Sequence, residues 1–207
     1  LPGDNAIVIA LAARSLPKHL QKKAIIWGTV GAITVRSLMT IGVVWLLKIP
    51  GLMLVGGLGL VWIAYKLQVD NHGDDGEHGP AATTFWGAMK TIIIADALMG
   101  VDNVLGVAGA AHGAMDLVVL GLLISVPIVV FGSTMVLKLV ERFPIIIKAG
   151  AAVLAFTAGK MIVNEPVIKA TFAEPTFYWG LIALVVVGVL LAGWLKERSV
   201  AQKEQAA

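Results

Sequence analysis

Two Asp-Asn pairs are the residues in this sequence whose types are best suited to chemistry. Asp4 and Asn5 lie at the start of the chain, and Asp102 and Asn103 lie 98 residues later, each pair shortly after a glycine and before a small, apolar stretch. Aspartate offers charged oxygen atoms and asparagine a neutral carbonyl oxygen. Sites made only of oxygen suit magnesium, calcium and manganese rather than zinc or copper. The pattern indicates that the two pairs face each other and hold a hard divalent cation.

A third carboxylate, Asp96, lies in the same otherwise apolar stretch, TIIIADALMGVDNVLGVAGAAH. Ionisable groups at membrane depth are costly and usually functional. A break in the helix at Gly100 would bring Asp96 and Asp102 to one site. The alternative is a hydrogen-bonded clamp between helices. The predicted metal ligands are Asp4, Asn5, Asp96, Asp102 and Asn103.

Arg36 falls in the middle of the apolar stretch AITVRSLMT, where an unpaired arginine is costly. It is predicted either to balance a site carboxylate when no cation is bound or to form a structural salt bridge between two helices. The glycine-rich segment 69–80, VDNHGDDGEHGP, is best interpreted as a solvated linker between two halves of the chain. A weak, cytoplasmic metal-collecting role for this linker would use His72, Asp74, Asp75, Glu77 and His78.

The composition places these residues in a membrane protein. The chain has 207 residues, of which 58% are hydrophobic and 14% charged, whereas about a quarter of a soluble domain is charged. The absence of cysteine excludes disulfides, thiolate metal sites and iron–sulfur clusters. Metalloprotease, nucleophile-elbow, Walker and dinucleotide-binding motifs are also absent. We therefore expect neither an enzyme nor a permanently bound cofactor.

Hydrophobic stretches of spanning length predict an all-α integral membrane fold with seven transmembrane helices. Three matches suggest that the first six form a 3+3 repeat: the two Asp-Asn pairs are 98 residues apart, and Pro50 matches Pro144 and Lys66 matches Lys160, both 94 residues apart. The repeat is expected to be inverted, because equivalent loops differ in basic residues. The expected organisation is a first three-helix repeat at 1–67, a cytoplasmic linker at 68–83, a second repeat at 84–163, and a seventh helix with a cytoplasmic tail at 164–207. The predicted spans are about 1–13, 24–47, 51–67, 84–111, 117–139, 145–163 and 177–195.

The first helix is expected to be truncated, because the second repeat has a half-helix before its Asp-Asn pair and the first has only three residues there. Orientation follows from basic residues: Arg14, Lys18, Lys22 and Lys23 follow the first span, whereas residues 104–137 contain no lysine or arginine. Cytoplasmic loops carry the excess of basic residues. The N-terminus is therefore expected outside and the C-terminus in the cytoplasm. Inverted repeats are typical of secondary transporters.

The stretch GDNAIVIALAARSLP, the basic KHLQKK after it and AIIWGTVGAITVRSLMT closely resemble the TerC family of bacterial integral membrane proteins. The most similar branch is the YjbE-type metal transporters, and the resemblance extends from Leu1 to about Leu195. It implies a seven-span protein associated with manganese export and tellurite resistance. The family's Gly-Asp-Asn motif falls on Asp4 and Asn5, with Asp96, Asp102 and Asn103 in the second half. The chain departs from the family because the N-terminal half-helix, with its acidic residue, is absent.

The resulting hypothesis is a multi-pass secondary transporter in the bacterial cytoplasmic membrane, exporting divalent cations. The resemblance makes Mn²⁺ the expected substrate, and carboxylates that alternate between metal and proton could couple export to proton exchange. The alternatives are a Ca²⁺/H⁺ exchanger and a non-transporting scaffold or accessory protein of a metal or tellurite stress response. The expected partners are the metal ion and the lipid bilayer, without nucleic acid; assembly into a homo-oligomer is left open.

Overall fold

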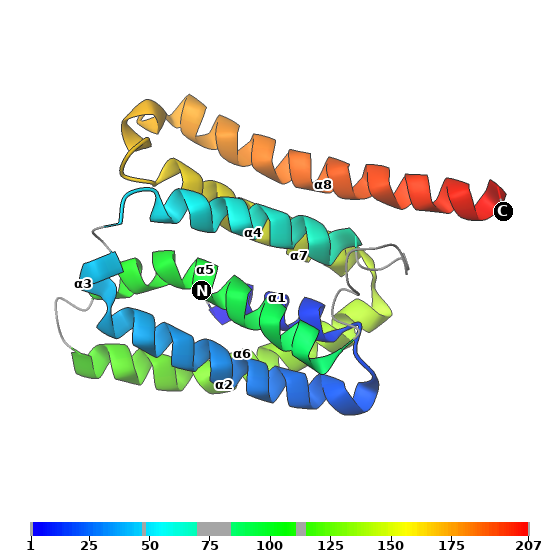
Figure 1. The fold of residues 1–207 in the computed structure, drawn as a ribbon, viewed down its shortest axis with the longest axis horizontal. Helices are drawn as coiled ribbons and strands as arrows, with labels where there is room; N and C mark the ends of the chain where they lie inside the picture. Colours follow the sequence, from blue (N-terminus) through cyan, green and yellow to red (C-terminus); the bar gives the residue numbers. More distant parts are fainter. Residues whose placement is uncertain (1, 47–48, 70–83, 111–114, 207) are drawn as a thin grey trace.

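The chain forms a bundle of helices that lie side by side along its long axis (Figure 1). The computed structural model describes residues 2–46, 49–69, 84–110 and 115–206, with side chains omitted at some helical positions that include 102, 103 and 105–110. These residues form helices and no strand. The elements are α1 (Pro2–Ala13), α2 (Lys18–Ile41), α3 (Val43–Leu46), α4 (Leu52–Val69), α5 (Phe85–Ala110), α6 (Met115–Arg142), α7 (Ile145–Val163), the 3₁₀ helix η1 (Lys169–Phe172) and α8 (Pro175–Ala206).

Proline and glycine set several of the helix ends. Pro17 and Pro144 directly precede α2 and α7, where the missing N–H costs nothing because the first N–H groups of a helix lack intrahelical partners. Gly42 ends α2, and its N–H donates to the carbonyl of Leu38 at 3.0 Å. Gly51 has a φ of +80°, a left-handed conformation that turns the chain into α4.

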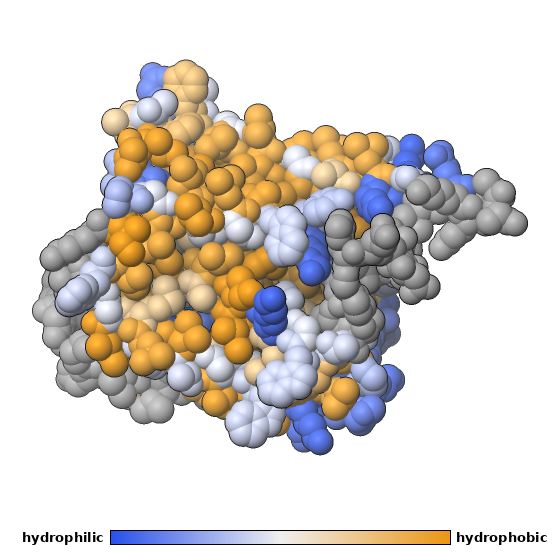
Figure 2. Space-filling model, viewed as in Figure 1, coloured by the Kyte–Doolittle hydropathy of each residue, from blue (hydrophilic) through white to orange (hydrophobic). Residues whose placement is uncertain are grey.

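Five helices in the described ranges are long and apolar enough to cross a membrane, which confirms the all-α membrane character. These are Lys18–Ile41, Leu52–Val69, Ile124–Arg142, Ile145–Val163 and Pro175–Ser199. Apolar residues cover the middle of the face shown in Figure 2, and most of its hydrophilic residues gather toward the end where the C-terminus lies. Several large apolar side chains of the described residues, such as Trp62 and Leu184, are more than half exposed, as expected for contact with lipid.

Helices from the two halves of the sequence pack in matching pairs. α1 packs mainly on α6, α5 mainly on α2, and α4 on α7, while α8 covers α7 and α4. The α4–α7 contact is close because Gly57 lies on it: a Cβ there would stand 2.9 Å from the carbonyl oxygen of Ala158 and 2.7 Å from Ile162. Small residues at such contacts let helix backbones approach in a membrane.

The first and fifth helices differ in where they begin. α1 starts about halfway along the bundle, whereas α5 runs nearly its full length in the same region (Figure 1). α5 also continues through Gly100 without the break considered from the sequence. A single glycine costs a helix only about 1 kcal/mol, and Gly100 is held against Met39 of α2, whose sulfur would lie 3.3 Å from an added Cβ.

Candidate functional site

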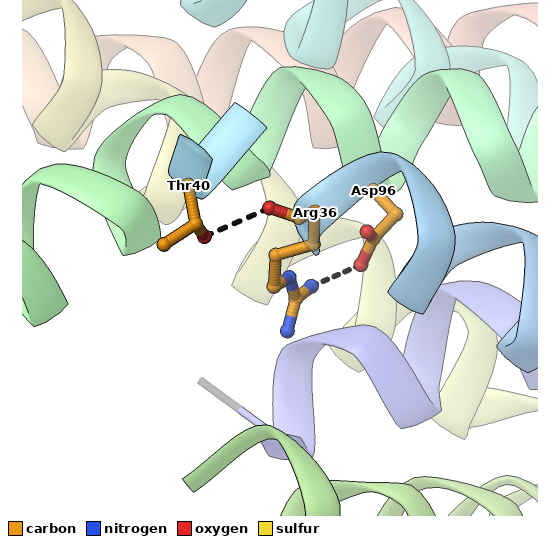
Figure 3. Close-up of polar contacts among 3 residues, drawn as sticks. All are labelled: Arg36, Thr40 and Asp96. Carbon is orange, nitrogen blue, oxygen red and sulfur yellow. Dashed lines mark hydrogen bonds and ion pairs between the residues drawn. The ribbon is translucent and has the colours of Figure 1, made fainter. Parts of the chain in front are cut away.

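A buried ion pair joins α2 and α5 in the interior of the bundle. Nη2 of Arg36 donates to Oδ1 of Asp96, and the dashed line in Figure 3 marks this contact. Asp96 is 3% exposed, and the side chain of Arg36 is 13% exposed. Thr40, one turn after Arg36, donates its hydroxyl to the carbonyl oxygen of Arg36 at 2.8 Å. Arginine and carboxylate at this depth neutralise each other, as costly intramembrane charges must.

Close packing of α2 on α5 brings the two charges within reach. Gly28 and Gly31 of α2 face Ile92 and Ile93 of α5; a Cβ at Gly28 would stand 2.8 Å from Ile92, and one at Gly31 would stand 3.0 Å from Ile93. The two isoleucines directly precede the turn that carries Asp96. Without side chains at these two glycines, the helices approach until Arg36 reaches the carboxylate.

Asn5 of α1 is the third polar residue of this site. It is 4% exposed, and with its amide oxygen turned toward α2 it accepts from Nη1 of Arg36 at 3.1 Å and from Nη2 at 2.8 Å. This orientation of the amide is the one that satisfies the hydrogen-bonding groups around it. The guanidinium of Arg36 therefore lies between a carboxylate oxygen and a neutral carbonyl oxygen.

These residues line a small cavity of about 10 Å³ with both polar and apolar walls, which is at the lower limit for one water molecule. Among the described residues, none donates to Oδ2 of Asp96 or accepts from Nε of Arg36, although both atoms are buried. A buried carboxylate oxygen without a partner is costly unless a ligand satisfies it. The walls come from α1, α2, α5 and α6, and consist of Asn5, Ile9, Thr29, Ala32, Ile33, Arg36, Asp96, Ser125 and Val129.

The structure brings only some of the predicted ligands together. Asn5 and Asp96 meet at the cavity. Asp4 is half-buried in the first turn of α1 and does not line the cavity. Asp102 and Asn103 belong to α5, but their side chains lie outside the described part. Within that part, no three histidine, aspartate or glutamate side chains converge as a metal site would require. The proposed metal-collecting residues His72, Asp74, Asp75, Glu77 and His78 also lie outside the described ranges.

Sequence reasoning missed one buried carboxylate, that of Glu165, which follows α7 and is 1% exposed. It accepts hydrogen bonds from the backbone N–H groups of Gly51, Met53 and Leu54, at 3.0, 3.0 and 3.3 Å, and from that of Val167 at 3.4 Å. Burial raises the pKa of Glu165, but the four N–H groups outweigh burial and hold the pKa below its usual range. The signal that could have found Glu165 is an acidic residue directly after an apolar span.

Comparison with known proteins gives a consistent result. The family model described as "Integral membrane protein TerC family" matches residues 1–201. The chain is 42% identical to the uncharacterized membrane protein YjbE of Bacillus subtilis, over 84% of this chain and 79% of that protein. It is 25% identical to YkoY of the same species, over 99% of this chain and 72% of the relative. The chain is 22% identical to the UPF0053 inner membrane protein YoaE of Escherichia coli K12, over 70% of this chain and 31% of that protein. No solved structure matches.

Proposed function

The chain belongs to the TerC family of integral membrane proteins, and we propose that it is a secondary transporter that exports divalent cations, with Mn²⁺ as the main substrate. The observation that carries this proposal is the carboxylate of Asp96. It is buried among apolar helices beside a small cavity that it lines, and its Oδ2 atom has no hydrogen-bond donor among the described residues. A carboxylate in this setting is a ligand for a positive charge.

The ligand set of the proposed site combines charged and neutral oxygens. Asp96 and Asn5 supply one of each, and both line the cavity. The other proposed ligands are Asp4, which precedes Asn5 in α1, and Asp102 and Asn103, which lie later in α5 than Asp96. An oxygen-only set of this kind favours Mn²⁺, Mg²⁺ or Ca²⁺ over softer metals. Selectivity among these three cations depends on coordination number and site flexibility.

The matching helix pairs support the proposed 3+3 inverted repeat of 1–67 and 84–163. Under this arrangement α1 corresponds to α5, α2 to α6 and α4 to α7, so the α1–α6 contact is the counterpart of the α5–α2 contact. The cavity then lies where helices of both halves meet, as transporter sites do. With α8 as the last helix, the proposed bundle has seven spans in the bacterial cytoplasmic membrane, with its N-terminus outside and its C-terminus in the cytoplasm.

Flux measurements on the purified protein in liposomes test the proposal. Vesicles loaded with Mn²⁺, Ca²⁺ or Mg²⁺ should release Mn²⁺ fastest, and Asp96→Asn should abolish release. Proton exchange is a further part of the proposal, because carboxylates bind metal only when deprotonated; a pH-sensitive dye inside the vesicles reports it. Faster release of Ca²⁺ would indicate a calcium exchanger. Vesicles that release no divalent cation would favour the non-transporting scaffold, in which Arg36 and Asp96 only join two helices.

A further inference from the structure

The guanidinium of Arg36 stands where a cation would be bound. It contacts Oδ1 of Asp96 and the amide oxygen of Asn5, which are a charged and a neutral oxygen ligand from two different helices. The remaining cavity, about 10 Å³, does not have room for a hydrated divalent ion beside the guanidinium. A metal ion coordinated by Asp96 and Asn5 would also be repelled by a positive charge in contact with the same oxygens.

An alternating-access carrier must return after it has released its cargo. During that step a buried carboxylate without a counter-charge would be strongly unfavourable. A proton or a second cation can supply the missing charge, and the carrier is then an obligatory exchanger. A basic side chain attached to the protein can supply it equally well, because it returns with the protein.

We propose that Arg36 acts as an attached counter-cation, alternating with the transported cation on Asp96. This inference rests on the proposed function. It identifies the group that compensates the negative charge of Asp96 after the cation has been released. When the cation binds, the guanidinium leaves the carboxylate; when the cation departs, the guanidinium returns. Net export then requires neither a counter-flowing proton nor a second metal ion, although a proton can still substitute for the guanidinium.

The test separates net flux from exchange in liposomes that hold the intact protein. Vesicles are loaded with radioactive Mn²⁺, the pH is equal on both sides, and the membrane potential is clamped. Net efflux is measured into Mn²⁺-free medium, and exchange is measured into medium that contains unlabelled Mn²⁺. We expect wild-type protein to carry out both. Arg36→Gln should lose net efflux by at least about tenfold, because its carboxylate returns uncompensated, but should retain exchange.

Two variants control for loss of charge and loss of folding. Lys160→Gln removes an exposed basic residue outside the cavity and should leave both fluxes unchanged. Arg36→Lys keeps the charge and should restore much of the net efflux that Arg36→Gln loses. A second readout is the Mn²⁺ concentration that stabilises the purified protein against heat. Removing a competitor should make Arg36→Gln bind Mn²⁺ more tightly than wild type, whereas a purely structural salt bridge predicts weaker binding. If Arg36→Gln does not fold, Arg36→Lys still tests the binding comparison: its ammonium cannot span both oxygens, so it should compete less and Mn²⁺ should bind more tightly than to wild type.

Each outcome is decisive. No Mn²⁺ flux of either kind by wild-type protein would overturn the proposed function and this inference with it. Wild-type efflux that takes up protons in a fixed ratio to the Mn²⁺ released, as an internal pH-sensitive dye would report, would overturn the inference alone, since a proton would then be the required counter-charge. Net efflux by Arg36→Gln at the wild-type rate, or weaker Mn²⁺ binding by the substituted proteins, would also overturn it.

Discussion

The carboxylate of Glu165 accepts a hydrogen bond at 3.0 Å from the backbone N–H of Met53, which lies 112 residues earlier in the chain. Gly51 and Leu54 donate to the same carboxylate. The first N–H groups of a helix have no intrahelical partners, and at the start of α4 a residue from beyond the end of α7 satisfies them. This contact fixes the ends of two helices that also pack along their length.

Replacing Glu165 by glutamine should therefore destabilise the protein. One oxygen and the negative charge are lost, so we expect a loss of about 2 kcal/mol at neutral pH, measured as a lower midpoint of thermal unfolding in detergent. Because the pKa of Glu165 is lowered in the folded protein, its contribution is complete above the ordinary value of 4.5 and disappears as the pH falls through the lowered pKa. The two proteins should thus converge in acid. Glu174→Gln, an exposed control, should match wild type at every pH.

The α4–α7 contact predicts that Gly57→Ala will be harmful although alanine is a better helix former. The added Cβ would stand 2.9 Å from a backbone oxygen, which cannot move aside as a side chain could. Overpacking of this kind costs about 1–3 kcal/mol. Gly180→Ala is the matched control, because nothing lies within 4 Å of its Cβ position; it should be neutral or stabilising. Equal effects of the two substitutions on the thermal midpoint would contradict the packing shown here.

Charge balance at the cavity predicts that substitutions of Arg36 and Asp96 will have non-additive effects on the stability of the protein. Asp96→Asn leaves Arg36 without its counter-charge and should destabilise the protein by about 3–5 kcal/mol. The double variant Arg36→Gln/Asp96→Asn has neither charge of this pair and should recover most of that loss. Neither protein should transport Mn²⁺. Thermal unfolding of the four proteins measures the coupling, and additive effects would show that the ion pair does not form.

Asn5→Ala tests the neutral ligand separately from the charged one. Because it removes an amide oxygen but no charge, we expect the Mn²⁺ concentration for half-maximal flux to rise by about tenfold, equivalent to about 1.4 kcal/mol. The maximal rate should change little. Thr134→Ala is a suitable control, since that hydroxyl is exposed on α6 and bonds only within its own helix among the described residues. A rate that falls while the half-maximal concentration stays constant would place Asn5 outside the binding step.

Because the sequence contains no cysteine, single introduced cysteines can establish the orientation cleanly. Thr171 of η1 and Glu141 near the end of α6 are both exposed. In the proposed orientation Thr171→Cys faces outward and should react with an impermeant thiol reagent in intact cells. Glu141→Cys should react only after the cells are permeabilised. The reverse pattern would invert the topology.

The helix positions could largely be predicted from hydrophobicity, and the differences have a physical cause. The predicted span 145–163 coincides with α7, and the span 51–67 differs from α4 by one residue at its start and two at its end. α2, in contrast, begins at Lys18, six residues before the predicted span, because the basic segment KHLQKK continues the helix beyond the apolar region. Hydrophobicity detects what can lie in a bilayer, and helices extend into the interface.

The candidate site was only partly predictable. Residue type and membrane depth identified Asp96, Asn5 and Arg36 one by one, since each is a costly polar group in an apolar stretch. Which carboxylate Arg36 contacts could not be predicted, because that depends on how α2 and α5 are rotated about their axes. The capping role of Glu165 was missed for the same reason: its partners are backbone groups of a helix more than 100 residues away, and no side-chain pattern marks them.

The close contact of α4 with α7 and the proposed recognition of a cargo constrain different residues of this sequence. All nine residues that line the cavity come from α1, α2, α5 and α6, and none comes from α4, α7 or α8. The α4–α7 contact therefore shares no residue with the set that would recognise a cargo. Substitutions at the cavity can consequently alter cargo recognition without altering the packing of α4 on α7. A random mutational scan should reproduce this division, with losses of abundance on α4 and α7 and changes of metal tolerance around the cavity.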